Sequence, residues 1–403
     1  MMKHPLRAVP LCLLLAACGD SETSSGSAND RSDTSADTAS DSSSDTLLDD
    51  TAVDAAEGSD ADGSADTTAD TAAEDTTADT AVEDTTADTG SEDTTADTAA
   101  DGSGDGLTPA ERRCARIRAS VEEAGFADKV TITCDATKAE LTSNTYPDHD
   151  LMNGIIATNE QIPVEAPGHT VPVMLAPTFA PAPLTVDGAL GVAVNGVPIY
   201  DYSGAGDIDT STYDPAVDTL VTGQLDHCGG HSGRGDDYHY HAAPVCMIAA
   251  MPNRDSQPIL GWGFDGFPMF GDTNPDGSTI PAGTLDSCNG QPDPEFGYRY
   301  HTSVAPPYVM KCLKGQVDLT TVPRVRPLSR QGGGGGRTSG RPPAGGVQGL
   351  VHRVEASGLH ALEYTYNGQP YYLHYTPRPD GCFDFETSTV TSNGVLETGV
   401  FCR

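Results

Sequence analysis

The chain has 403 residues and a formal net charge of −37, from 59 acidic and only 22 basic side chains. This excess of negative charge excludes a protein that binds the phosphate backbone of nucleic acids, because such proteins present basic patches. Ten cysteines, 44 glycines and 29 prolines instead favour a loop-rich fold held by disulfides.

Residues 1–18 have the pattern of a processing signal, with basic side chains ahead of a short apolar core. The core is too short to span a bilayer as a helix, and Leu15–Cys18 (Leu-Ala-Ala-Cys) resembles a bacterial lipobox. We therefore expect an exported protein that is anchored to a membrane by a lipid on Cys18. Gly19 favours the outer membrane or cell surface of a Gram-negative bacterium. An ordinary signal peptide with a chance cysteine is the alternative.

Residues 19–106 form an acidic segment rich in Asp, Thr and Ala, with 26 acidic residues and one basic residue. The unit Glu-Asp-Thr-Thr-Ala-Asp-Thr recurs at 74–80, 83–89 and 92–98, and the segment has no aromatic residue. It cannot bury enough apolar surface to offset the entropy of ordering, so we expect a disordered tether that self-repulsion extends. Weak calcium binding is an alternative, although the spacing is not that of an EF-hand.

The sequence of residues 107–403 predicts a mainly β fold with one short N-terminal helix. Thr108–Glu111 is a capping box with proline at the first helical position, and it predicts a helix over 109–124. The alternating segment 129–134 predicts a strand. Farther along, Asn195-Gly196 predicts the turn of a β-hairpin. Short strands joined by glycine- and proline-rich loops are expected up to about residue 320.

The segment 226–241 is unusually dense in histidine. It holds four of the eleven histidines of the chain within sixteen residues, namely His227, His231, His239 and His241. In an extended strand His239 and His241 point to one face, and Tyr238 and Tyr240 point to the other. Imidazoles paired in this way suit a transition metal or a proton-transfer site.

The same pattern recurs 60 residues downstream. Leu225–His231 is echoed by Leu285–Gln291, and Tyr238–His241 is echoed by Tyr298–His301. Each copy then runs into a second cysteine, which predicts an internal tandem duplication of Cys…Tyr-x-Tyr-His…Cys units. The second copy lacks three of the four histidines and keeps only His301. We therefore expect any metal chemistry mainly in the first copy.

Eight cysteines remain once the leader is removed and Cys18 carries a lipid. An even number in an exported chain implies disulfides, and the repeated units favour pairing between neighbours. The expected pairs are Cys114–Cys134, Cys228–Cys246, Cys288–Cys312 and Cys382–Cys402. Each short loop closed in this way contributes on the order of 3 kcal/mol. Zinc-bound thiolates are the alternative, but the chain has no Cys-x2-Cys pair.

The sequence predicts three segments after the tether. Residues 107–323 form the main domain, and 324–346 form a linker rich in glycine, arginine and proline. Residues 347–403 form a small β unit, with a hairpin turn at Asn367-Gly368.

The main domain contains a series of ordered motifs, namely Thr142–His149, Val192–Ile199, Tyr238–His241 (Tyr-His-Tyr-His), Leu260–Gly271, Tyr298–His301 and Cys312–Gly315. Together these motifs resemble one known family, the YHYH-domain proteins. The resemblance covers about residues 128–316 and implies a domain of that type. It implies no activity, since the family is a domain of unknown function. Arg299 stands where a second Tyr-His-Tyr-His motif would have its first histidine, so the two copies of the motif are not symmetric.

The candidate metal ligands are six histidines. They are His227, His231, His239, His241, His149 and His301, with Asp226 and Asp265 as carboxylates that orient the rings. Three or four neutral imidazoles suffice for zinc or copper, the cofactors we expect if any is bound.

Three alternatives to a metal-binding module remain open. The histidines and tyrosines could form a buried hydrogen-bond network without metal. A metal-bound water could instead support hydrolysis, although no signature such as His-Glu-x-x-His is present. The aromatic residues, including Trp262, could stack on a carbohydrate or another polymer. Whether the protein is an enzyme, and which soluble or surface ligand it meets, the sequence does not decide.

Overall fold

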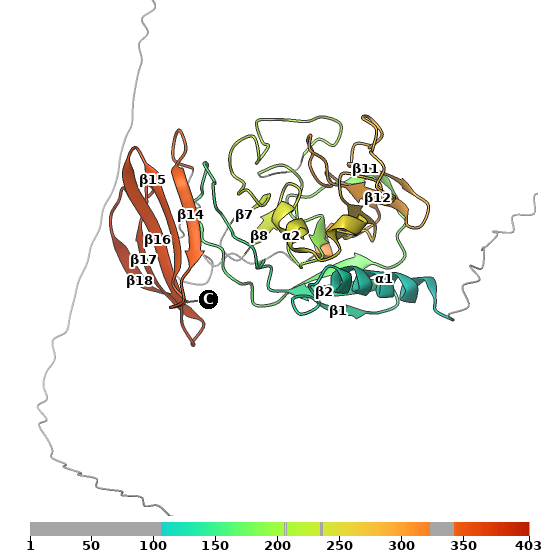
Figure 1. Ribbon diagram of the computed structural model, residues 1–403, viewed down its shortest axis with the longest axis horizontal. Coiled ribbons are helices and arrows are strands. Elements are labelled where there is room, and N and C mark those ends of the chain that lie inside the picture. The colour runs from blue at the N-terminus through green and yellow to red at the C-terminus, as the bar shows by residue number, and fades with distance from the viewer. Residues whose placement is uncertain (1–105, 205, 207, 234–236, 323–341, 403) are drawn as a thin grey trace, which may run out of the picture. The chain divides into compact units, whose positions relative to one another are not determined.

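The computed structural model describes residues 106–204, 206, 208–233, 237–322 and 342–402 (Figure 1). The predicted leader, Cys18, the tether up to residue 105 and most of the predicted linker lie outside these residues. The described chain is mainly β, with a single helix of more than two turns, which confirms the predicted fold class. No helix within the described ranges is long and apolar enough to cross a membrane.

Helix α1 (Pro109–Glu123) begins at the predicted capping box. The backbone N–H of Thr108 donates to Oε2 of Glu111 at 2.7 Å, and the N–H of Glu111 donates to Oγ1 of Thr108 at 3.2 Å. The helix packs against a three-stranded antiparallel sheet in the order β1-β2-β3. Its strands are β1 (Thr131–Cys134), β2 (Lys138–Ser143) and β3 (His169–Met174).

The histidine motif lies in a larger, eight-stranded sheet in the order β11-β12-β10-β9-β5-β6-β8-β7. Its strands are β5 (Gly191–Ala193), β6 (Pro198–Ile199), β7 (Gly230–Ser232), β8 (Tyr238–Tyr240), β9 (Gly261–Gly263), β10 (Pro268–Phe270), β11 (Gly290–Asp293) and β12 (Gly297–His301). The order is symmetric about the β9–β5 pair, with β9, β10, β12 and β11 on one side and β5, β6, β8 and β7 in the matching order on the other. The sheet therefore consists of a first half, β5–β8, and a second half, β9–β12. The two halves meet where β5 pairs with β9, with Val192 opposite Trp262.

The two halves pair their strands in the same way. In the first half β6 is parallel to β8, and β8 is antiparallel to β7. In the second half β10 is parallel to β12, and β12 is antiparallel to β11. The predicted hairpin at Asn195-Gly196 is present between β5 and β6, with Gly196 at φ +82°. Whether the halves arose by tandem duplication stays a prediction.

Shorter elements connect these sheets. They are β4 (Phe179–Leu184), which pairs with β13 (Leu313–Gly315), helix α2 (Val245–Ala250), and the 3-10 turns η1 (Arg254–Ser256) and η2 (Leu319–Thr321). The core beneath the sheets is aromatic, and Trp262 lies in it with no exposed surface. The indole N–H of Trp262 donates to Oγ of Ser120 in α1 at 3.0 Å. Trp262 is therefore a core residue and cannot stack on a sugar.

The last described strands form a five-stranded antiparallel sheet, β14 to β18 in chain order (Figure 1). They are β14 (Gln348–Val354), β15 (His360–Tyr366), β16 (Gln369–Pro377), β17 (Cys382–Ser388) and β18 (Glu397–Cys402). The predicted turn at Asn367-Gly368 joins β15 to β16. The sheet contacts the loop after β2, where the hydroxyl of Tyr375 donates to the carbonyl of Pro163 at 2.8 Å.

All four predicted disulfides are confirmed. They are Cys114–Cys134, Cys228–Cys246, Cys288–Cys312 and Cys382–Cys402. The first joins α1 to β1, and the last joins β17 to β18. The second and third each tie the base of one histidine-motif hairpin to the chain that follows it.

Candidate metal centre

Three histidines of the first half converge at the edge of the eight-stranded sheet. The register of the β7–β8 hairpin places His231 directly opposite His239, and His241 follows two residues later on the same face. Their ring centroids are 4.7 to 5.1 Å apart. One ring nitrogen from each lies within 4.8 Å of the other two. In a tetrahedral zinc site with bonds of about 2.0–2.1 Å, nitrogens are about 3.3 Å apart. Small inward shifts of the rings would therefore suffice to hold a metal.

Backbone groups fix the orientation of these rings. Nδ1 of His239 is hydrogen-bonded to the carbonyl oxygen of Asp237, and Nδ1 of His241 is hydrogen-bonded to the carbonyl oxygen of Asp201. A carbonyl oxygen can only accept, so in a neutral ring Nδ1 carries the proton and Nε2 keeps its lone pair. Histidines that bind metals are commonly oriented by such a bond.

The Nε2 atom of His241 is buried and has no hydrogen-bond partner among the described residues. The exposed fraction of His241 is 2%, and those of His239 and His231 are 6% and 8%. Buried polar atoms nearly always have a partner, because an unpaired one costs about 1–3 kcal/mol. Among the described residues, this nitrogen is therefore the atom of the cluster that still lacks a hydrogen-bond partner.

Burial keeps the imidazoles of His231 and His241 neutral. It lowers the pKa of His231 to about 3 and that of His241 to about 4, since the charged form is poorly solvated there. The proximity of His241 lowers the pKa of His231 further. Neutral imidazoles offer lone pairs to a metal at pH 7, whereas protonated ones do not.

Tyr200, which follows β6, packs on the cluster. Its ring stacks on His239 with centroids 4.0 Å apart and meets the edge of His241 at 5.6 Å. Neither Tyr200 nor the carbonyl of Asp201 was foreseen from the sequence. They reach the cluster because β6 lies parallel to β8, with Ile199 opposite Tyr240. A local sequence pattern carries no signal for that pairing.

The second half places other side chains at the equivalent positions. Gln291 lies opposite Arg299 across the β11–β12 hairpin, and His301 follows. Nδ1 of His301 is hydrogen-bonded to the carbonyl of Gly271 at 2.7 Å, as His241 is to that of Asp201. Its Nε2, however, accepts from Nε of Arg299 at 2.9 Å. The ring nitrogen that lacks a partner in the first half thus faces a guanidinium cation in the second.

One family model, described as YHYH protein, matches residues 170–280. This region is a YHYH domain. The match confirms the expected family and contains His231, His239 and His241, whereas the flanking segments of the expected range, 128–316, extend beyond it. No curated protein and no solved structure matches the chain.

Three of the six predicted ligands lie away from the YHYH-domain cluster. His227 is exposed, and its Nδ1 lies 3.2 Å from the carbonyl of Asn153. His301 belongs to the second half. Nε2 of His149 is hydrogen-bonded to the hydroxyl of Tyr240 at 2.8 Å, on the opposite face of β8. Sequence alternation placed His239 and His241 together, but it could not place His149 or His227.

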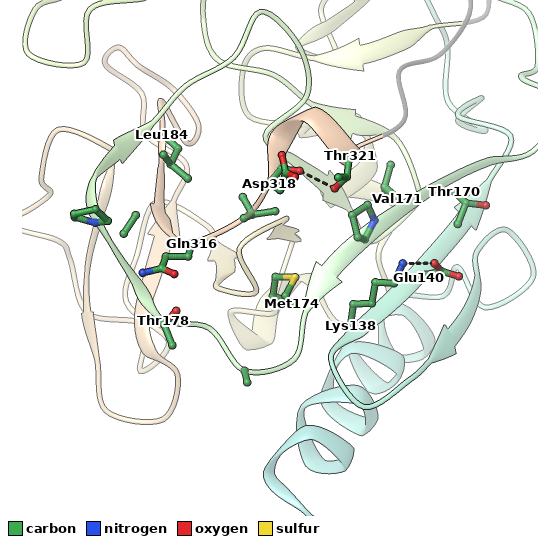
Figure 2. A pocket seen from close by; sticks show the side chains of 15 residues that line it. Lys138, Glu140, Thr170, Val171, Met174, Thr178, Leu184, Gln316, Asp318 and Thr321 are labelled. Carbon is green, nitrogen blue, oxygen red and sulfur yellow. Dashed lines mark hydrogen bonds and ion pairs between the residues drawn. The ribbon is translucent and has the colours of Figure 1, made fainter.

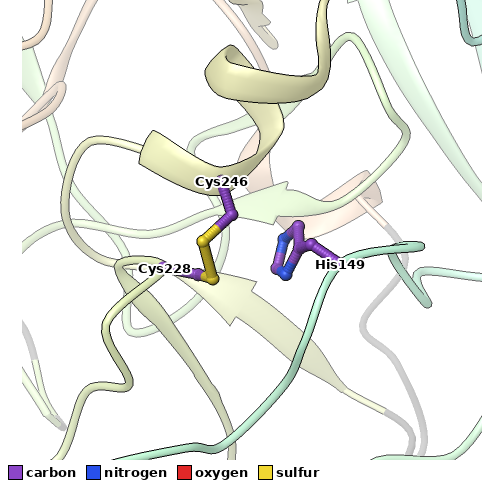
Figure 3. Close-up of side chains that lie close together, drawn as sticks. All are labelled: His149, Cys228 and Cys246. Carbon is purple, nitrogen blue, oxygen red and sulfur yellow. A yellow bond between two sulfur atoms is a disulfide. The ribbon is translucent and has the colours of Figure 1, made fainter.

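His149 lies beside the disulfide between Cys228 and Cys246 (Figure 3). The two sulfur atoms are bonded to each other, so they are not available as thiolate ligands. His149, Cys228 and Cys246 are therefore not a metal site, because the cysteines form a disulfide and the histidine is hydrogen-bonded to Tyr240.

The two aspartates predicted to orient the rings have another role, which corrects that expectation. Asp226 accepts the hydroxyl of Tyr238 at 2.9 Å and the N–H of Gly230 at 3.1 Å. Asp265 accepts the hydroxyl of Tyr300 at 2.5 Å. Burial raises the pKa of both carboxyls, that of Asp265 to about 6. They hold the tyrosine faces of the hairpins, and backbone carbonyls orient the imidazoles instead.

A groove of the domain lies elsewhere, between β3, β4 and the turn η2 (Figure 2). It has a volume of about 900 Å³. Met174 and Leu184 contribute apolar surface, and Lys138 forms an ion pair with Glu140 at 2.6 Å on its rim. No aromatic side chain is among the described residues that line it, so the groove lacks the stacking surface that a carbohydrate site uses.

Proposed function

We propose that this protein is an exported, lipid-anchored surface protein whose YHYH domain binds a transition metal ion, zinc or copper, through His231, His239 and His241. The observation that carries the proposal is the buried Nε2 of His241, which has no partner among the described residues. One ring nitrogen of His241 lies within 4.8 Å of a ring nitrogen of His231 and of His239.

The chemistry of the three donors supports a metal over a closed hydrogen-bond network. A network of neutral imidazoles needs one N–H for each acceptor, yet the N–H groups of His239 and His241 point at backbone carbonyls. The buried Nε2 of His241 has no donor among the described residues, and a metal ion bound there would satisfy its lone pair. Zinc and copper both take imidazole nitrogen readily. Three protein ligands would leave a fourth position for water or a ligand.

Metal analysis of the full-length protein, purified from the membrane in detergent, tests this proposal. After equilibrium dialysis against zinc, we expect about one equivalent per chain by elemental analysis. His241→Ala should weaken zinc binding by more than about 100-fold, because losing a ligand costs more than the 10- to 100-fold of losing its orienting partner. A folded wild-type protein that takes up neither zinc nor copper would overturn the proposal.

The matched control is His227→Ala. This histidine is four residues from His231 but exposed, so its removal should leave the metal content unchanged. Equal losses in His227→Ala and His241→Ala would show that the histidines act as a loose surface chelator and not as a built site.

The lipid anchor rests on the sequence alone and has its own test. Labelling of cells with a radioactive fatty acid should mark the wild-type protein and leave Cys18→Ser unmarked. Label that persists in Cys18→Ser would contradict the assignment of this cysteine.

A further inference from the structure

Arg299 lies at the place in the second half that corresponds to the metal position in the first. It takes the strand position of His239, directly opposite Gln291, which takes that of His231. Its exposed fraction is 8%. A buried arginine in a small hairpin needs partners for all its N–H groups, so its contacts show what this place in the fold accepts.

The guanidinium of Arg299 is held by an array of acceptors. Nε donates to Nε2 of His301 at 2.9 Å, and one terminal nitrogen donates to Oδ2 of Asp293 at 2.5 Å. The other donates to Oδ1 of Asn274 at 2.7 Å. A neutral imidazole, a carboxylate and an amide oxygen are all atom types that also bind metal ions. The array is suited to a cation, and the chain supplies that cation itself.

Each half also keeps one carboxylate next to this place, but from opposite strands. In the second half it comes from Asp293 on β11, which pairs with Gly297 on β12. In the first half the positions 60 residues earlier are reversed, as Gly233 and Asp237. A Cβ atom built on Gly233 would lie 3.2 Å from Oδ2 of Asp237 and 3.2 Å from Cε1 of His239. The carboxylate of Asp237 and the ring of His239 therefore both border the space that a side chain on Gly233 would occupy.

We propose that Arg299 is a built-in cation, whose guanidinium takes in the second half the place that a metal ion takes in the first. The inference rests on the metal site proposed above and adds that the chain binds one metal ion and not two. Because a guanidinium neither dissociates nor loses its proton, the second half is independent of metal supply. The first half alone responds to it.

The gain of a second site tests this inference. Gln291→His combined with Arg299→His, in the full-length protein, restores three imidazoles around His301. Equilibrium dialysis and elemental analysis should give about two zinc equivalents per chain, against about one for wild type. Adding His301→Ala to the double variant should return the value to about one.

The outcomes separate this inference from the proposed function. One equivalent in wild type and one in the folded double variant would overturn the inference and leave the proposed function standing. A wild-type protein that binds no metal would overturn both.

The reverse exchange keeps the inference testable if the gain variant does not fold. His231→Gln, His239→Arg, Gly233→Asp and Asp237→Gly together give the first half the cation and the carboxylate of the second. This variant should bind no zinc, keep its near-UV circular dichroism, and show a Tm that does not change on adding a chelator. A variant that still binds one equivalent, or that unfolds while the gain variant also fails to bind a second ion, would overturn the inference.

Discussion

In the first half of the eight-stranded sheet three imidazoles face one another, whereas in the second half an imidazole, an amide and a guanidinium take the same strand positions. The opposite faces of the two hairpins share one tyrosine–aspartate contact. The hydroxyl of Tyr238 donates to Asp226 at 2.9 Å, and that of Tyr298 donates to Asp286 at 2.9 Å. The tyrosine face therefore builds each hairpin, and the opposite face sets its chemistry.

A glycine at the base of each hairpin shows why the tyrosine face cannot vary freely. A Cβ atom on Gly230 would lie 2.7 Å from the hydroxyl of Tyr238, and one on Gly290 would lie 2.2 Å from that of Tyr298. Either contact is far inside van der Waals distance. The tyrosine reaches its aspartate only by passing over a residue without a side chain, so glycine, tyrosine and aspartate form one unit in both halves.

The largest effect on stability should come from Arg299→Met, which removes the buried guanidinium of the second half. It leaves the carboxylate of Asp293 buried without its cation, and we expect a loss of about 3–5 kcal/mol in the free energy of unfolding. His239→Met in metal-free protein should cost less, because no charge is left unpaired. Urea unfolding with a chelator present measures both.

The double variant Arg299→Met with Asp293→Asn serves as the control for this prediction. It removes both charges and should recover much of the loss, because the unpaired carboxylate is gone. If the two single changes in the two halves cost the same, charge does not distinguish the halves.

Asp265→Asn should have a smaller effect on the free energy of unfolding, and this effect should depend on pH. The change places an amide in the second half at the position that corresponds to Asn195 in the first. Burial raises the pKa of Asp265 to about 6, above its value of about 3.9 in the unfolded chain. The folded protein therefore holds a proton that the unfolded chain has lost, and this contribution to stability declines as pH rises from about 4 to about 6. The variant should lack that decline, worth on the order of 1–3 kcal/mol.

The difference between variant and wild type, measured by urea unfolding at several pH values, isolates this group. Asp201 in the first half also has a pKa raised to about 6 by burial, and its contribution cancels in that difference. A difference that does not change between pH 4 and 6 would contradict the assignment.

Local rules predicted those parts of the fold that short segments specify. The capping box fixed the start of α1 at Pro109, and the two Asn-Gly turns closed their hairpins. The pairing of Cys228 with Cys246 and of Cys288 with Cys312 followed from the repeated units, since each pair encloses one of them, and the other four cysteines were paired as neighbours. The identity of the orienting groups could not be predicted in this way, because the carbonyl of Asp201 comes from the segment after β6, 40 residues before His241.

The sequence also contains a second internal echo. Leu190–Asp201 and Leu260–Gly271 align at an offset of 70 residues, with leucine, glycine and proline at matching positions. The backbone N–H of Leu190 donates to the carbonyl of Ile199 at 2.9 Å, and that of Leu260 donates to Met269 at 2.7 Å. Together with the offset of 60 residues, this alignment indicates the two halves of the sheet, although it does not specify which strands lie side by side.

The sequence by itself determined the class of fold, the four disulfides and the shared face of His239 and His241, because strand alternation and short-loop closure act within a few residues. Only the tertiary structure decided that His231 joins them while His149 and His227 do not, and that a guanidinium replaces the cluster in the second half. Those outcomes depend on cross-strand register and on the parallel pairing of β6 with β8. Both are set by long-range packing in the core, which no local pattern of residues specifies.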